Sequence, residues 1–150
     1  MNLPDVPLQR DEVYELACNL DDMLPEDIGF AMDLLLDAGA LDVYTVPIGM
    51  KKNRPGTMLC CLCRAGEEDT FTRLLLRHTT TLGVRMQKME RRTLTRQTVI
   101  RDTPLGPVCC KITPLKEKPE LEDLAAIARA HDLSLAEVRR VVAQAKDETT

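Results

Sequence analysis

The sequence predicts an α+β domain, and three observations support this class. Apolar residues recur at the spacing of strands and then at the spacing of helices, and the two patterns alternate along the chain. Of its 150 residues, 44% are hydrophobic and 29% are charged, so the chain can bury one core, with or without a small appendage. Only 3% are aromatic, so that core is expected to consist of Leu, Val, Ile, Met and Cys.

The first two expected elements are a strand over residues 12–19 and a helix that begins at Pro25. The strand segment is rich in strand-forming residues and ends in a polar cluster. The helix has an acidic first turn, which suits the positive end of the helix dipole, and Gly39 is expected to end it. Its apolar stripe at helical spacing comprises Ile28, Met32, Leu35 and Leu36.

Two further strands are expected over residues 41–48 and 57–64. The second of them is apolar at nearly every position, which is typical of an interior strand. A helix follows, with acidic residues at positions 67–69 and a buried stripe that extends to His78. Alternation of Leu82, Val84 and Met86 with polar residues predicts a fourth strand and places Arg85 on the opposite face. The order βαββαβ is the ferredoxin-like pattern.

The remainder of the chain predicts a β-hairpin followed by a pair of helices. Residues 98–101 and 107–112 are strand-like and are joined by a turn. Two helical stripes follow Pro119, and Ser134 with Glu137 forms a capping box at the start of the second helix. We therefore expect a ferredoxin-like, nucleotide-binding domain at residues 1–92 and a β-hairpin with a helical extension at residues 93–150.

The segment between Gly49 and Gly56 is a candidate anion site. The glycines allow the backbone to bend, and lysine and arginine side chains bind phosphate oxygens well. A solvated basic turn is the alternative interpretation. The candidate phosphate ligands in this loop are Lys51, Lys52, Asn53 and Arg54.

A second candidate loop lies before the fourth expected strand, where hydroxyl groups and an arginine follow a helix end. Its candidate phosphate ligands are Thr79, Thr80, Thr81 and Arg85. Asp21 and Asp22 lie between a strand and a helix, where they could hold a hard divalent ion or serve as an acidic pair at the helix N-terminus. His78 is expected to be a cation at the C-terminus of a helix, and His131 is expected at a solvated helix end.

Composition argues against several classes of function. The net charge of -4 and the lack of Trp argue against nucleic-acid binding, which uses basic faces and stacking aromatics. No apolar run of membrane-spanning length and no signal peptide are visible, so a cytoplasmic chain is expected. The six cysteines lie in strand-like segments, with Cys61 and Cys63 on one face and Cys60 on the other, and are expected to be reduced core residues.

Several ordered segments resemble the C-terminal half of the LarC family, the nickel insertion proteins of the nickel-pincer nucleotide cofactor. The resemblance extends from Glu15 to Val138. The matching segments are residues 19–23, Pro25-Glu26, residues 39–43, residues 50–57, residues 79–85 and residues 118–120.

The resemblance implies a CTP-dependent nickel chelatase that inserts Ni into pyridinium-3,5-bisthiocarboxylic acid mononucleotide, for lactate racemase and related enzymes. It assigns nucleotide phosphates to the two candidate loops, and Mg or Mn to Asp21 or Asp22. It also implies an N-terminal half as partner, and a homo-oligomer is expected. The alternative function is a non-catalytic, ligand-sensing or oligomerisation module of the same fold.

Overall fold

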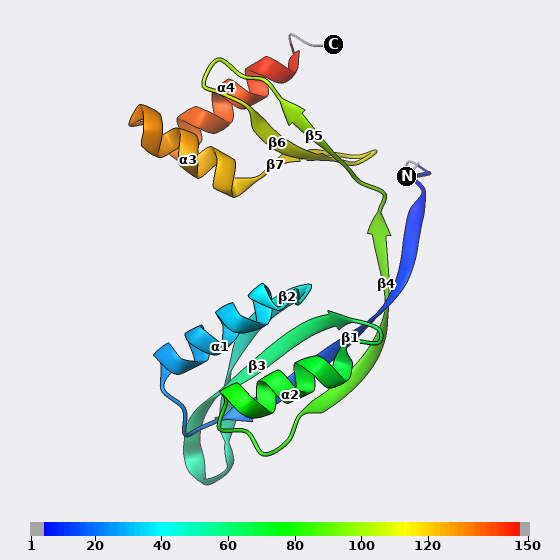
Figure 1. Ribbon diagram of the computed structural model, residues 1–150, viewed down its shortest axis with the longest axis vertical. Helices are drawn as coiled ribbons and strands as arrows, with labels where there is room; N and C mark the ends of the chain where they lie inside the picture. The colour runs from blue at the N-terminus through cyan, green and yellow to red at the C-terminus, as the bar shows by residue number, and fades with distance from the viewer. Residues whose placement is uncertain (1–4, 148–150) are drawn as a thin grey trace. The chain divides into compact units, whose positions relative to one another are not determined.

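A computed structural model describes residues 5–147 of the chain, and these residues form two compact units. One unit is Arg10–Arg92, and the other contains residues 93–147 together with residues 5–9. The class is α+β with antiparallel sheets, as expected (Figure 1). No helix among the described residues is long and apolar enough to cross a membrane.

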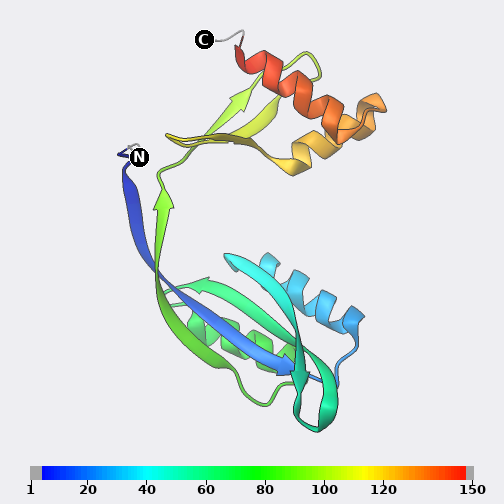
Figure 2. The same cartoon turned by 180° about the vertical axis from the view of Figure 1, so that it is seen from behind.

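The first unit contains a four-stranded sheet with the strand order β2-β3-β1-β4. Helices α1 and α2 cover one face of this sheet, and the other face is open, as the two opposite views show (Figures 1 and 2). The element order βαββαβ agrees with the expected one. The elements are β1 Leu8–Leu20, α1 Pro25–Asp37, β2 Asp42–Met50, β3 Arg54–Arg64, α2 Glu68–His78 and β4 Arg85–Leu94.

The core of this unit lies between the sheet and the two helices. Side chains alternate along β3, so Cys61 and Cys63 join the core, whereas Cys60 is buried on the opposite face beside Tyr44. The predicted division of the cysteines between the two faces is therefore confirmed. The buried residues of the core are Leu16, Cys18, Leu20, Ile28, Leu35, Val43, Leu59, Cys61, Cys63, Phe71 and Leu75.

The fourth strand differs from the prediction. It begins only at Arg85, and Leu82 lies outside it with its side chain fully exposed. The hydroxyl of Thr81 accepts a hydrogen bond from the backbone N–H of Gly83 and donates one to the carbonyl of Gly83, so these residues form a turn. Local side-chain hydrogen bonds of this kind compete with strand pairing. The alternating pattern at 82–86 was thus too short to place the strand.

The bend between β2 and β3 also differs from the prediction. A short 3₁₀ turn, Lys51–Asn53, joins the strands, and the left-handed backbone lies at Lys52 (φ 62°) and Asn53 (φ 57°). Gly49 is not in this region. Gly56 is needed for a different reason, because a Cβ there would lie 3.0 Å from the carbonyl oxygen of Leu20. This glycine thus permits close approach of two strands.

The second unit packs a three-stranded sheet, in the order β5-β6-β7, against two helices. The hairpin and the helical pair were predicted, but β7 was not. It has three residues and ends in a proline, which is tolerated because it is an edge strand. The elements are β5 Gln97–Arg101, β6 Val108–Ile112, β7 Glu117–Pro119, α3 Leu121–His131 and α4 Leu135–Asp147. Their buried core comprises Val108, Cys110, Leu124, Ile127, Ala128, Val138 and Val142.

Candidate functional site

Three loops meet at one end of the four-stranded sheet. Strands β1 and β2 are both antiparallel to β3, so both end on the same side, where the β2–β3 turn also lies. The loop between α2 and β4 reaches this end too, as Figure 1 shows at the lower end of the unit. The topology therefore gathers the predicted site residues from three separate parts of the sequence.

The β2–β3 turn is linked to the β1–α1 loop by an ion pair. Nη1 of Arg54 lies 3.3 Å from Oδ2 of Asp21. The arginine side chain is 55% exposed and the aspartate is 18% exposed, so the pair lies at the surface. Exposed ion pairs stabilise a fold by only about 0–1 kcal/mol. Arg54 can therefore exchange this carboxylate for another anion at little cost.

The α2–β4 loop is linked to the same region by two side chains. The hydroxyl of Thr80 donates a hydrogen bond to Oδ1 of Asp22, at 2.5 Å. Nη2 of Arg85 donates to Oδ1 of Asn19, at 2.8 Å, and lies 3.4 Å from the sulfur of Met58. The two aspartates are thus held between a guanidinium on one side and a hydroxyl on the other.

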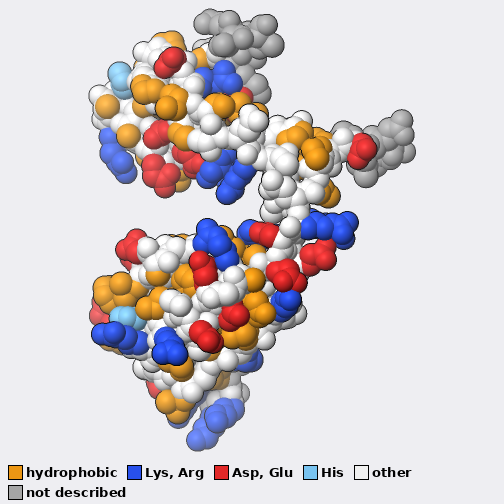
Figure 3. Space-filling model, turned by 45° about the vertical axis from the view of Figure 1, so that its right-hand side comes forward, with side chains coloured by type: hydrophobic (Ala, Val, Ile, Leu, Met, Phe, Trp, Pro, Cys, Tyr) orange, Lys and Arg blue, Asp and Glu red, His pale blue; other side chains and the backbone are white. Residues whose placement is uncertain are grey.

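Not every predicted ligand is tied into this arrangement. Thr79 donates its hydroxyl proton to the carbonyl of Leu75, and so caps the end of α2. The turn residues Lys51, Lys52 and Asn53 are exposed, and no side chain among residues 5–145 forms a hydrogen bond or ion pair with them. Lys and Arg side chains gather at the tip of this unit (Figure 3). The turn therefore presents unpaired positive charge to solvent.

The described residues contain no cluster of three or more His, Cys, Asp or Glu side chains that could hold a metal ion. Asp21 and Asp22 are two neighbouring oxygen donors, which suit a hard cation that takes its other ligands from a bound molecule and water. Burial raises the pKa of Cys61 to about 12 and that of Cys63 to about 11. These thiols stay protonated at neutral pH and behave as small core residues.

Sequence reasoning missed a hollow beside these loops, between the start of α1 and the end of α2. Its volume is about 390 Å³, and its walls include Asp22, Asp27, Phe30, Arg77, His78 and Thr80. The rings of Phe30 and His78 meet edge to face, with centroids 6.5 Å apart. Figure 3 shows hydrophobic, basic and histidine side chains side by side on this unit. The available signal was that Phe30 lies off the apolar stripe of α1.

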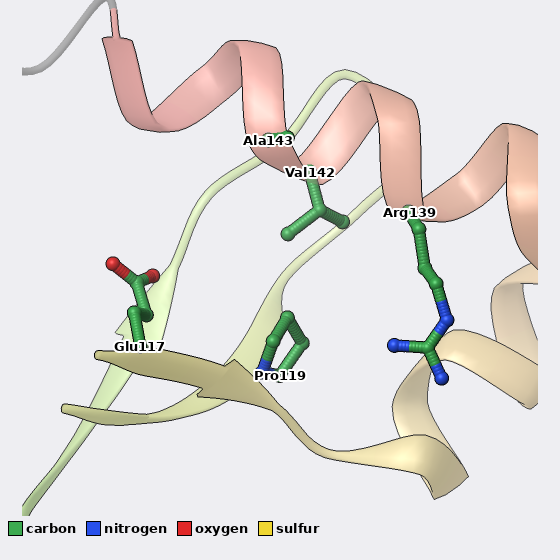
Figure 4. A pocket seen from close by; sticks show the side chains of 5 residues that line it. All are labelled: Glu117, Pro119, Arg139, Val142 and Ala143. Carbon is green, nitrogen blue, oxygen red and sulfur yellow. The ribbon is translucent and has the colours of Figure 1, made fainter.

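A second hollow lies in the three-stranded unit and holds none of the predicted site residues. Its volume is about 250 Å³, and Glu117, Pro119, Arg139, Val142 and Ala143 line it (Figure 4). Arg101 forms two hydrogen bonds with Glu117: its Nε and Nη2 donate to the two carboxylate oxygens at 2.8 and 3.0 Å. Pairing of this kind favours a structural role for that carboxylate.

Comparison with known proteins shows the family to which the chain belongs. Residues 3–139 match the sequence profile of the family described as nickel insertion protein. The chain belongs to this family. A family member from Enterococcus faecalis is 41% identical over 144 residues, which is 93% of this chain and 44% of that protein. The pyridinium-3,5-bisthiocarboxylic acid mononucleotide nickel insertion protein of Staphylococcus epidermidis is 42% identical over 126 residues, or 81% of this chain and 32% of that protein.

Solved structures agree with this family membership. The chain has a TM-score of 0.87 and 37% identity to LarC2, the C-terminal domain of a cyclometallase involved in the synthesis of the NPN cofactor of lactate racemase. That match covers 93% of this chain and 99% of the LarC2 chain. A protein from Methanopyrus kandleri, at 23% identity and a TM-score of 0.65, shares the fold. The present chain spans less than half of the length of the curated family members it matches.

Proposed function

We propose that this chain is the CTP-binding part of a nickel chelatase that inserts Ni into pyridinium-3,5-bisthiocarboxylic acid mononucleotide. The relatives' names support the substrate and the metal. The observation that carries the nucleotide proposal is the meeting of three polar loops at one sheet end, with unpaired lysines beside a loosely held arginine. Nickel is the inserted substrate here, and the ion that accompanies CTP is Mg or Mn.

The proposed binding mode uses an exchange of partners. Lys51 and Lys52 attract the triphosphate, and Arg54 leaves Asp21 to bind phosphate oxygens as a planar donor. Asp21 is then released to hold the divalent ion together with Asp22 and the phosphates. The remaining phosphate donors are Asn53, Thr79, Thr80, Thr81 and Arg85. Left-handed backbone at Lys52 is uncommon for a residue with a side chain and is consistent with a functional turn.

We further propose that the four-stranded unit is a ferredoxin-like domain and that the protein acts in the cytoplasm as a homo-oligomer. Insertion itself would require the N-terminal half that full-length relatives possess, since the chain corresponds to 44% or less of the first curated relatives. The chain alone should therefore bind CTP without producing the nickel cofactor.

The decisive test is calorimetric titration with a nucleotide panel in the presence of Mg or Mn. Wild-type chain should bind CTP, and the double variant Lys51→Ala/Arg54→Ala should bind it at least about tenfold more weakly, because it lacks two charge-assisted contacts. Arg96→Ala/Lys116→Ala is the matched control, since it removes the same charge from exposed positions in the other unit. Unchanged affinity in the first double variant would refute the proposed loop.

The metal assignment has its own test. Asp21→Asn and Asp22→Asn should each weaken CTP binding and flatten its dependence on Mg or Mn, whereas Asp33→Asn, on the exposed surface of α1, should not. Full metal dependence in the first two variants would place the divalent ion elsewhere. If the wild-type chain binds none of the nucleotides, the non-catalytic module becomes the better interpretation.

A further inference from the structure

The open face of the four-stranded sheet also carries a hollow, on the side opposite to α1 and α2 (Figure 2). Ala17 and Met58 line it, and both alternate along their strands with core residues, so their side chains point away from the helices. Its volume of about 420 Å³ is in the range of sites that hold small organic ligands. The residues that line it are Glu15, Ala17, Met58, Arg85, Met86 and Gln87.

The floor of this hollow is apolar and half-buried. Ala17 and Met58 lie on the neighbouring strands β1 and β3, and each is partly covered. Cys60, the register partner of Ala17, is 1% exposed, and Tyr44 lies beside it on β2. A floor of this kind, which includes a polarisable thioether, packs well against a planar ring.

Two charged groups line the hollow without an oppositely charged partner. Glu15 and Arg85 form no ion pair with each other or with another side chain of residues 5–145. Glu15 accepts a hydrogen bond from the hydroxyl of Tyr44 at 2.6 Å, and Arg85 donates to the amide oxygen of Asn19 at 2.8 Å. Both partners are neutral, and Glu15 and Asn19 lie about 13 Å apart along β1. The hollow therefore offers a negative end and a positive end.

The mononucleotide in the name of the Staphylococcus epidermidis relative carries groups that match these ends. Its pyridinium ring is a planar cation joined to ribose through the ring nitrogen, and its two thiocarboxylates lie on the far side of the ring from that nitrogen. A carboxylate attracts a cationic ring and accepts hydrogen bonds from ribose hydroxyls, whereas a guanidinium binds anionic thiocarboxylates as it binds carboxylates. An uncharged ring would leave Glu15 without a counter-charge.

We propose that this hollow holds the pyridinium ring of the substrate against Met58, with Glu15 beside the ring nitrogen and ribose and with Arg85 at the thiocarboxylates. This inference rests on the proposed function, which supplies the identity of the substrate. Asn19, the partner of Arg85, directly precedes the last residue of β1, so the thiocarboxylates would lie next to the β1–α1 loop and its two aspartates. The substrate and the triphosphate would therefore meet at one end of the sheet.

The test is calorimetric titration with nicotinic acid mononucleotide, whose ring is a pyridinium cation with one carboxylate, and with its dihydropyridine form, whose ring is neutral. The wild-type chain should bind the pyridinium form at least about tenfold more tightly, and Glu15→Gln should remove most of this preference, because the amide carries no charge. Met58→Ala should weaken the binding of both forms several-fold, since the ring loses its floor. CTP affinity should be unchanged in Glu15→Gln. Glu122→Gln is the matched control, because it removes the same charge from an exposed position in the other unit.

The outcomes separate this inference from the proposed function. If the wild-type chain binds CTP but discriminates between the two probes as little as Glu15→Gln does, this inference fails and the phosphate site stands. If the wild-type chain binds neither CTP nor the probes, both proposals fail. If Met58→Ala changes the mass measured by sedimentation and leaves both probe affinities unchanged, the face is a contact between copies of the chain and the inference is wrong. Glu15→Gln keeps an oxygen that accepts the Tyr44 hydroxyl, so this variant should fold, which circular dichroism would verify.

Discussion

The two units of this chain differ in how selected charged side chains are paired and exposed. In the three-stranded unit, Arg101 on β5 forms two hydrogen bonds with Glu117 on β7, and both side chains are at most 15% exposed. In the four-stranded unit, Lys51 and Lys52 stand exposed at a turn, and no other described side chain pairs with them. Paired, shielded charges fix the position of strands, whereas unpaired cations in one turn repel each other until an anion arrives. The contrast supports the proposal that ligand binding occurs in the four-stranded unit.

The largest expected effects distinguish the cores of the two units. Phe71→Ala should destabilise the four-stranded unit by about 3–5 kcal/mol, because it leaves a cavity in a fully buried cluster. Leu124→Ala should cost the three-stranded unit about 2–5 kcal/mol for the same reason. Hydrogen exchange should show faster amide exchange in the mutated unit alone. Equal acceleration in both units would show that they unfold as one.

Alkaline pH should weaken the four-stranded unit in particular, because its core holds two strongly shifted thiols. Burial raises the pKa of Cys61 to about 12 and that of Cys63 to about 11, from an ordinary value of 9.0. Their contribution is fully present below pH 9 and is lost as pH rises toward 11–12, by on the order of 1 kcal/mol for each pH unit and thiol. Urea unfolding between pH 8 and 11 would measure this loss.

The control for this pH dependence is a chain without the two thiols. Cys61→Val/Cys63→Ala should lose less stability than the wild type over this range. Burial also raises the pKa values of Cys18 and Cys60, so these thiols leave a smaller pH dependence, to which Tyr44 adds at higher pH. Donation to Glu15 raises the pKa of that tyrosine. Tyr44→Phe would remove the contribution of this tyrosine to the pH dependence of stability. A double cysteine variant that loses stability as steeply as the wild type would assign the alkaline transition to other groups.

An exchange of arginines tests the comparison most directly. Arg101→Ala should destabilise the fold by about 2 kcal/mol, because Glu117 loses two charge-assisted hydrogen bonds, yet CTP binding should remain. Arg54→Ala should do the reverse: its exposed pair contributes little to folding, but CTP affinity should fall several-fold. Thermal unfolding and calorimetry on both variants would measure the two effects. Equal losses of affinity would remove the distinction between the units.

Sequence patterns predicted the parts of the fold that depend on neighbouring residues. Helix α1 begins at Pro25, as its acidic first turn suggested, and β3 follows the apolar run that predicted an interior strand. Patterns of a few residues were less reliable. Alternation at 82–86 placed β4 too early, and β7 is too short and too polar to give a signal. A periodic pattern over a long segment is distinguishable from alternation that arises by chance, whereas a pattern of a few residues is not.

The residues of the candidate site could be named from the sequence, whereas their arrangement in space could not. The resemblance assigned Asp21, Arg54 and Thr80 to one nucleotide and its metal ion, and the sheet topology explains why these residues meet at one end. The position of Phe30 was missed because its contact with His78 depends on where α2 lies, which local periodicity does not encode. The bend in the basic turn was assigned to glycines because they adopt positive φ most easily, yet Lys52 and Asn53 take that conformation.

The smallest expected effect concerns a cap in the three-stranded unit. The hydroxyl of Ser134 accepts a hydrogen bond from the N–H of Glu137, and the Glu137 carboxylate accepts hydrogen bonds from the N–H and hydroxyl of Ser134. Ser134→Ala should therefore destabilise α4 by about 1 kcal/mol.

The hydrogen bonds of this cap lower the pKa of Glu137 from 4.5, so the contribution of Glu137 to stability is present above pH 4.5 and is lost as pH falls through the lowered value. Circular dichroism should show this acid sensitivity in the wild type and not in Glu137→Gln. CTP affinity should be unchanged in both variants, and a loss of binding from a change at this cap would mean that the second unit takes part in the site.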